Sequence, residues 1–281
     1  MPLPDDSPAG KPRSVFFVSD RTGITSEALG RSLMSQFNGR QFRQVTLPFV
    51  ITADKANEAV ARINAAALAD GVRPVVFSTL VDDAIRKIVR HSNALYLDFF
   101  ATFIGPLERE LQMKSSHAAG RAHASAEDAA YVQRIEAVNF ALASDDGVTL
   151  KNYPRADVIL VGVSRSGKTP TCLYLALQFG VFAANYPLTE DDLARGHLPE
   201  ALTHFLPKLY GLTINAGRLQ QIRNRRRPDS RYASAPQVHY EVQRAEEMFR
   251  AARVQYMDTT HPSIEEIAST ILHQTGIERR F

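Results

Sequence analysis

Short apolar runs and amphipathic stretches alternate along most of the chain. In the first half, each apolar run of strand length is followed by a stretch whose apolar residues recur at helical spacing. Strands are predicted at residues 15–18, 44–47, 75–77 and 95–97, and helices at 24–37, 56–69, 81–90 and 100–112. In the first helix the residues at this spacing are Ile24, Ala28, Leu29, Leu33 and Phe37. Such alternation predicts a mostly parallel sheet covered by helices.

The segment 114–126 interrupts this alternation. Its sequence, K-S-S-H-A-A-G-R-A-H-A-S-A, is small, polar and typical of a loop or linker. A helix is predicted next at 127–143, ended by Asp145-Asp146-Gly147. Strands are then predicted at 156–161, 181–186, 209–214 and 254–257, and helices at 170–179 and 236–252. Ser263 and Glu266 predict a capping box at the start of a last helix.

The sequence G-V-S-R-S-G-K-T at residues 162–169 matches the phosphate-binding loop (P-loop) pattern of two glycines, a lysine and a hydroxyl. A predicted strand ends directly before it, and a predicted helix begins directly after it at Pro170. The alternative is an ordinary tight turn, which has no need of Gly-Lys-Thr. We therefore expect the whole loop to bind the cofactor: Gly162, Val163, Ser164, Arg165, Ser166, Gly167, Lys168 and Thr169.

Each residue type in this loop has a physical role in holding phosphate. Gly162 and Gly167 are expected to adopt backbone angles that a side chain would forbid, so that successive N–H groups point into one concavity. The start of a helix adds unpaired N–H groups and a favourable dipole. Lys168 is expected to reach the terminal phosphates, and the Thr169 hydroxyl to hold Mg²⁺.

These patterns predict an α/β protein with two domains. We expect a disordered tail at 1–12, a Rossmann-like α/β domain at 13–113, a linker and helix at 114–154, and a P-loop kinase-like α/β domain at 155–281. The 281 residues, 44% of them hydrophobic and 22% charged, suffice for cores of this size.

Several classes of protein are disfavoured by composition. No apolar run approaches the length of a membrane span, and the first residues lack the apolar stretch of a secretory signal. Cys172 is the only cysteine, which excludes an intramolecular disulfide and a thiolate metal cluster. We expect Cys172 to be a small core residue and the protein to be cytoplasmic. The eight histidines form no helical pair with metal-ligand spacing, so no structural metal is expected.

The net charge of +3 is mild, but arginines crowd one stretch of the chain. They are Arg218, Arg223, Arg225, Arg226, Arg227 and Arg231. One interpretation is a solvated basic helix end. The others are an anion clamp over phosphates and a dock for an acidic partner surface. Nucleic acid is disfavoured, because neither interleaved aromatic residues nor a known reader module accompanies the cluster.

Acidic residues stand where ligands of such sheets gather, at the carboxyl ends of strands. Asp20, Asp98 and Asp258 follow predicted strands, and Asp145 and Asp146 precede the strand that leads to the loop. Any of them could hold Mg²⁺ or accept a proton from a hydroxyl nucleophile. The alternative is that aspartate is favoured at turns and helix caps. The adjacent pair is the stronger candidate, because neighbouring like charges are unfavourable without a cation between them.

With these segments in view, the chain resembles the bacterial phosphoenolpyruvate synthase regulatory proteins, which belong to the same family as the plant pyruvate, phosphate dikinase regulatory proteins. The resemblance covers nearly the whole chain. It rests on V-S-D-R-T-G-I-T at 18–25, L-P-F-V at 47–50, N-F-A-L-A-S-D-D-G at 139–147, residues 158–177 with G-V-S-R-S-G-K-T-P-T, A-A-N-Y-P at 183–187, Y-G-L-T-I at 210–214 and S-R-Y-A-S at 230–234. Ser144 departs from it, because the family is expected to carry histidine before Asp-Asp-Gly.

The resemblance implies a bifunctional enzyme that phosphorylates a threonine of phosphoenolpyruvate synthase with ADP as donor, and so inactivates it. The enzyme would also remove that phosphate with inorganic phosphate and release pyrophosphate. On this interpretation the loop and Lys168 hold the β-phosphate of ADP, Thr169 binds Mg²⁺, and Asp145 or Asp146 accepts the threonine proton. The same loop could seat inorganic phosphate.

Other functions stay open at this point. One is an ATP-dependent P-loop kinase of small molecules, with the arginine cluster as a lid. Another is a nucleotide-binding switch without transferase activity, although no Asn-Lys-x-Asp guanine signature is present. The favoured interpretation requires a protein substrate and neither nucleic acid nor membrane, and a homodimer is compatible with it.

Overall fold

The computed structural model describes residues 12–37, 41–116, 127–147 and 150–280, which form two compact units, Met1–Ala124 and Ser125–Phe281. The division falls inside the segment 114–154 that was expected to join the domains. The helix of that segment, α5 (Glu127–Ala143), packs against α6 (Lys168–Phe179) of the second unit. Of the expected tail only Pro12 is described, and most of the expected linker, 117–126, lies outside the described residues.

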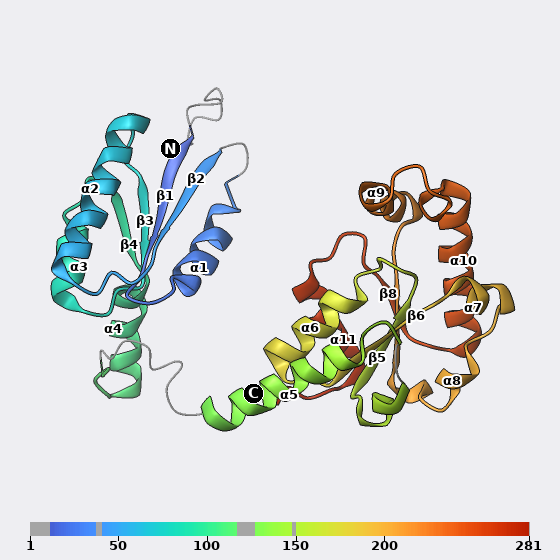
Figure 1. Ribbon diagram of the computed structural model, residues 1–281. Helices are drawn as coiled ribbons and strands as arrows, with labels where there is room; N and C mark the ends of the chain where they lie inside the picture. The colour runs from blue at the N-terminus through green and yellow to red at the C-terminus, as the bar shows by residue number, and fades with distance from the viewer. Residues whose placement is uncertain (1–11, 38–40, 117–126, 148–149, 281) are drawn as a thin grey trace. The chain divides into compact units, whose positions relative to one another are not determined.

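The first unit is a parallel four-stranded sheet with helices on both faces (Figure 1). The strand order is β2-β1-β3-β4. The strands are β1 (Arg13–Val18), β2 (Phe42–Leu47), β3 (Val75–Ser78) and β4 (Leu95–Asp98), and the helices are α1 (Ile24–Met34), α2 (Ala53–Asp70), α3 (Asp83–Arg90) and α4 (Phe99–Leu111). All eight elements were predicted, with bounds that differ by a few residues.

The core of this unit is split by the sheet, because successive side chains of a strand point to opposite faces. Phe16 and Val18 of β1 pack with residues of α2 and α3. Val15 and Phe17 pack on the opposite face with Phe77. This second face is the one that α1 approaches.

Helix α1 turns an unexpected side to the sheet. An amphipathic helix normally buries its apolar stripe, but here large residues of the stripe are 45% to 70% exposed, namely Ile24, Leu29 and Leu33. Phe37, the last residue of the predicted stripe, follows the helix and is also exposed. The buried positions of the helix are Ser26 and Gly30. A Cβ atom at Gly30 would lie 2.5 Å from the Phe17 ring and 2.7 Å from the Phe77 ring. The aromatic face of the sheet therefore admits only the small side of the helix.

The second unit repeats the parallel α/β arrangement, with strand order β6-β5-β7-β8. Its strands are β5 (Val158–Gly162), β6 (Ala183–Pro187), β7 (Leu209–Thr213) and β8 (Tyr256–Asp258). Besides α5 and α6, its helices are α7 (Glu190–Arg195), α8 (Glu200–Thr203), α9 (Ala216–Arg226), α10 (Ala235–Ala252) and α11 (Ile264–Thr275). Short 3₁₀ turns lie at Asp145–Gly147, Leu150–Arg155, Leu206–Lys208 and Arg231–Ala233.

Two hydrophobic clusters hold this unit together. Helices α5, α6 and α11 contribute to the cluster on one face of the sheet, and α7 to α10 to the cluster on the other (Figure 1). Cys172 is buried on α6 within the first cluster, as predicted for a core residue. The capping box predicted from Ser263 and Glu266 is present at the start of α11. Helices α7, α8 and α9 had not been predicted.

The structure confirms the predicted fold class, a Rossmann-like α/β unit followed by a P-loop kinase-like α/β unit. In the described part of the chain, no helix combines the length and the apolar character needed to cross a membrane.

Candidate active site at the phosphate-binding loop

The predicted loop lies at the carboxyl edge of the second sheet. It leaves β5 after Gly162 and enters α6 at Lys168. Strand β5 is flanked by β6 on one side and β7 on the other. The next strand along the chain is therefore added on one side of β5 and the following strand on the other. Parallel α/β sheets bind their ligands in the crevice at such a switch point.

The two loop glycines are needed for different reasons. Gly167 has φ of 91°, as predicted for a backbone position that disfavours a side chain. Gly162 lacks a positive φ, so the prediction that it adopts backbone angles forbidden to other residues was wrong. A Cβ atom at Gly162 would lie 2.3 Å from the carbonyl oxygen of Leu212 on β7. Arg165, with φ of 75°, supplies the loop's other left-handed position.

Neighbouring elements fix the loop through its carbonyl and hydroxyl groups. The Thr259 hydroxyl donates to the Ser166 carbonyl at 3.0 Å. The hydroxyls of Ser164 and Tyr232 lie 2.9 Å apart. With its backbone held in this way, the loop can present its N–H groups without first becoming ordered.

Lys168 is buried at the first position of α6, and its Nζ donates to the Val163 carbonyl at 2.9 Å. Burial lowers the pKa of Lys168 to about 8, and the nearby Asp146 carboxylate opposes this shift. The ammonium is therefore easier to deprotonate than an ordinary lysine, and a bound anion would stabilise its charged form.

Thr169, the predicted ligand of Mg²⁺, contacts one of the two candidate aspartates, Asp145. The Thr169 hydroxyl donates to Asp145 Oδ1 at 2.9 Å. Asn185 of β6 contacts Asp145 through Nδ2, and its Oδ1 accepts the backbone N–H of Asp146 at 3.1 Å. A hydroxyl and a carboxylate within one hydrogen bond are a donor set that Mg²⁺ accepts, together with water and substrate phosphate.

Asn185 was missed as a site residue, although it lies in one of the segments that carry the family resemblance. It is buried in β6, where asparagine is an unfavourable residue. An amide in the middle of an apolar strand was the available signal. Its partners could not be read from sequence, because they lie 16 to 40 residues away.

The loop opens into a cavity of about 490 Å³, a size typical of small-molecule sites. Asp146, with φ of 54°, is exposed and lines this cavity, whereas Asp145 is half-buried beside Thr169. The full lining is Asp145, Asp146, Ser164, Arg165, Gly167, Lys168, Thr169, Pro170, Pro187 and Arg226. Five of the eight predicted loop residues therefore share one cavity with the predicted acidic pair, and three cationic side chains face two carboxylates there. Gly162, Val163 and Ser166 do not line it.

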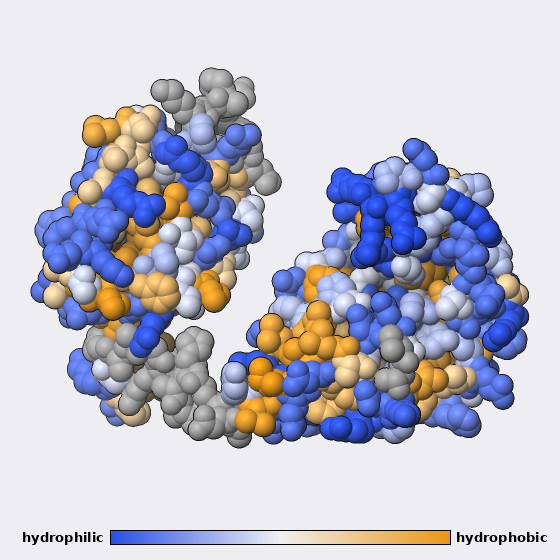
Figure 2. All heavy atoms as spheres, in the orientation of Figure 1, coloured by the Kyte–Doolittle hydropathy of each residue, from blue (hydrophilic) through white to orange (hydrophobic). Residues whose placement is uncertain are grey.

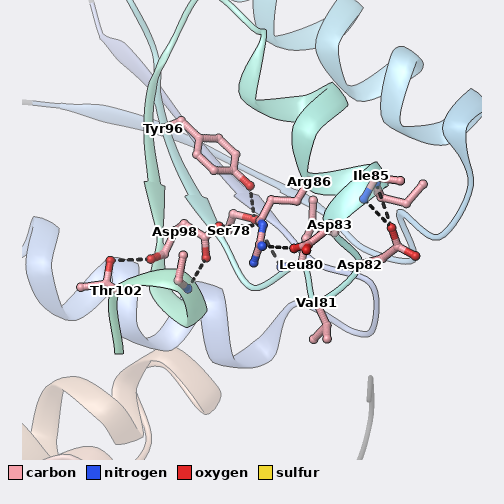
Figure 3. Close-up of polar contacts among 12 residues, drawn as sticks. Ser78, Leu80, Val81, Asp82, Asp83, Ile85, Arg86, Tyr96, Asp98 and Thr102 are labelled. Carbon is pink, nitrogen blue, oxygen red and sulfur yellow. Dashed lines mark hydrogen bonds and ion pairs between the residues drawn. The ribbon is translucent and has the colours of Figure 1, made fainter. Parts of the chain in front are cut away.

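The other candidate aspartates do not line this cavity. Asp98 caps α4 by accepting the Ala101 N–H at 2.8 Å and lies 3.5 Å from Arg86 (Figure 3). Asp20 accepts the Val81 N–H, and Asp258 accepts the Thr260 N–H. For Asp98 and Asp258 the contacts support the turn-and-cap interpretation. Asp20 instead makes a long-range contact, because Val81 lies 61 residues further along the chain.

The arginine cluster separates into different environments. Figure 2 shows a hydrophilic surface over α9, as expected for a solvated basic helix. Arg223 contradicts that interpretation, because it is wholly buried and pairs with Glu241 at 2.7 Å. Arg226 is exposed and lines the cavity. The helix therefore belongs to the site and is not merely solvated.

A parallel α/β unit that carries this loop between its central strand and the next helix is, by class, a P-loop nucleotide-binding protein. Residues 15–272 match the kinase/pyrophosphorylase family, and the chain belongs to this family of enzymes. It is 56% identical over 268 residues to a protein of Alkalilimnicola ehrlichii, covering 95% of this chain and 97% of the relative. It is 58% identical over 269 residues to a protein of Halorhodospira halophila, with 95% and 98% covered. Both relatives carry the name "Putative phosphoenolpyruvate synthase regulatory protein".

Proposed function

We propose that this enzyme regulates phosphoenolpyruvate synthase in the cytoplasm by two opposite reactions. The first transfers the β-phosphoryl group of ADP to a threonine of the synthase and inactivates it. The second transfers that group from the phosphothreonine to inorganic phosphate, which releases pyrophosphate and reactivates the synthase. The observation that carries the proposal is the single cavity in which the loop, Lys168, Thr169 and the two aspartates meet. The names of the relatives support the choice of target.

The cavity residues divide the work of binding. The loop N–H groups and Lys168 hold the β-phosphate of ADP, and the same groups hold inorganic phosphate in the second reaction. Thr169 and Asp145 would hold Mg²⁺, which supplies charge neutralisation on the phosphate oxygens. Asn185 keeps Asp145 oriented toward Thr169. Catalysis then rests on positioning and on charge stabilisation.

In the transfer from ADP, the threonine oxygen attacks the β-phosphorus. The bond from that phosphorus to the oxygen that bridges the two phosphates breaks, and AMP leaves. The threonine proton passes to a carboxylate, and we assign this role to Asp146, because Asp145 is engaged by Thr169 and Asn185. In the phosphorolysis an oxygen of inorganic phosphate attacks the phosphothreonine phosphorus, and the departing threonine oxygen recovers a proton from the same carboxyl group.

The test is to incubate the protein and phosphoenolpyruvate synthase with ADP labelled at the β-phosphate, and separately with ATP labelled at the γ-phosphate. Label on a synthase threonine from ADP alone is the expected result. Lys168→Ala should abolish both this transfer and the phosphate-dependent release of pyrophosphate, because it removes the buried ammonium of the phosphate seat. Lys87→Ala, at an exposed lysine of α3 in the other unit, should keep both.

Other outcomes would favour the competing functions. Transfer from ATP to a small molecule, with none to protein, would indicate the metabolite kinase. Tight nucleotide binding without any transfer would indicate a switch. Full activity in Lys168→Ala with an intact circular dichroism spectrum would refute the assignment of the loop.

A further inference from the structure

Helix α9 is fixed to the phosphate-binding loop by a buried arginine. Arg223 donates through Nη2 to the Ser164 carbonyl at 3.1 Å and to Glu241 at 2.7 Å. Its Nη1 donates to the Tyr232 carbonyl at 3.0 Å, and its guanidinium lies 4.2 Å from the centre of the Tyr232 ring. A buried cation with this many partners cannot shift without leaving charges unpaired. The last turn of α9 therefore keeps a constant place beside the loop.

Arg226 follows Arg223 by three residues, a spacing that puts both on the same side of the helix. It lines the cavity, its side chain is exposed, and it forms no ion pair with any described residue. Arg225 and Arg227 are also exposed, but they do not line the cavity. Of these three consecutive arginines, only Arg226 therefore lies at the cavity.

The charges of the cavity suggest what this arginine meets. Lys168 is buried beneath the loop, whereas Arg226 comes from a different element and is exposed to solvent. In the transition state of a phosphoryl transfer, negative charge is spread over the three equatorial oxygens of the transferred group. A guanidinium binds two such oxygens at once, which an ammonium does less well.

We infer that Arg226 is a further catalytic residue, which binds the oxygens of the phosphoryl group in the transition state of its transfer between donor and acceptor. This inference rests on the proposed function and assigns to Arg226 a role in both reactions. The bonds that form and break are those of the two transfers described above. Arg226 neither takes up nor releases a proton, so it acts through charge and geometry alone.

The experiment compares Arg226→Ala with Arg225→Ala, a change of the same size at the adjacent exposed position. Both are assayed for transfer from ADP and for phosphorolysis, and ADP binding is measured by calorimetry. Arg226→Ala should lower both turnover numbers by about 100-fold or more, as expected for the loss of one transition-state donor. Its ADP dissociation constant should change by less than about tenfold, because the interaction strengthens mainly in the transition state.

Two further readouts separate a catalytic contact from a structural one. Added guanidinium ion should restore part of the turnover of Arg226→Ala, and Arg226→Lys should fall between wild type and alanine. Arg225→Ala should stay within about twofold of wild type. If Arg226→Ala behaves like Arg225→Ala, or loses ADP affinity as far as turnover, the inference fails while the proposed function stands. If wild type transfers no phosphoryl group, the proposed function fails and takes the inference with it.

Discussion

Two adjacent carboxylates at the end of α5 meet different surroundings. Asp145 accepts the Thr169 hydroxyl and contacts the Asn185 amide. Asp146 has a left-handed backbone that turns its carboxylate to the cavity, where it forms no hydrogen bond with the described residues. The first therefore suits a metal ligand and the second a proton acceptor.

Asp146→Asn separates these roles. It should lower turnover by about 100-fold or more, because an amide cannot accept the threonine proton. ADP affinity should change by less than about threefold. Single-turnover labelling and equilibrium binding with the same preparation measure the two quantities. Asp145→Asn is the matched variant, and it should weaken the Mg²⁺ dependence of ADP binding instead. Equal losses of rate and affinity in Asp146→Asn would contradict its role as the base.

The lowered pKa of Lys168 predicts how ADP affinity depends on pH. Since burial lowers this pKa to about 8, the free protein loses the charge of its phosphate seat as pH rises through that value. ADP affinity should fall by about tenfold per pH unit above 8, because binding must then restore one proton. Calorimetry between pH 7 and 10 measures this slope, which Lys87→Ala should leave unchanged. Affinity that stays constant across the range would contradict the assignment.

Lys168 affects the stability of the fold in the opposite direction from ADP affinity as pH rises. Between pH 8 and the ordinary lysine value of 10.5, the unfolded chain holds the proton more tightly than the folded protein does. The contribution of Lys168 to the free energy of unfolding therefore increases as pH rises through this window. High pH should weaken nucleotide binding without weakening the fold at this residue.

Among the single elements, helix α1 shows that the apolar stripe of a helix does not always decide which side of the helix is buried. Gly30→Ala should lower the free energy of unfolding by about 1–3 kcal/mol, because the added methyl group meets the Phe17 and Phe77 rings. Leu33→Ser, on the exposed stripe of the same helix, should change it by less than about 0.5 kcal/mol. Urea denaturation measures both, and the reverse order would contradict this packing.

Strands and long helices could be predicted from the sequence because their apolar residues recur at the period of the element. Helix α5 was predicted with the bounds that the structure gives it. Helices α7 and α8 are too short for a periodic pattern, with six and four residues. Helix α9 is dominated by arginines, and one of them takes the buried position that an apolar residue would normally mark. The side of α1 that packs on the sheet could not be predicted, because it depends on Phe17 of β1 and Phe77 of β3.

At the scale of the whole molecule, each unit has hydrophobic clusters of its own, and every residue that lines the cavity belongs to the second unit. The contiguous loop could be recognised from sequence, and the acidic pair could be suggested. Asn185 could not, and within the arginine cluster the buried Arg223 and the cavity-lining Arg226 could not be told apart from their neighbours, because strand order and helix packing bring these residues to the loop. Neither strand order nor helix packing can be deduced from the spacing of residues along the sequence.

The single thiol of the chain has a practical consequence for studying these units. Cys172 is 2% exposed, and its Sγ lies 3.4 Å from the Ala184 carbonyl oxygen. Burial raises its pKa well above that of a free cysteine, so the folded protein offers maleimide reagents almost no thiolate. A cysteine placed on the surface of either unit would then be labelled alone, without removal of the native one. Spin or fluorophore pairs could thereby report the distance between the units in solution.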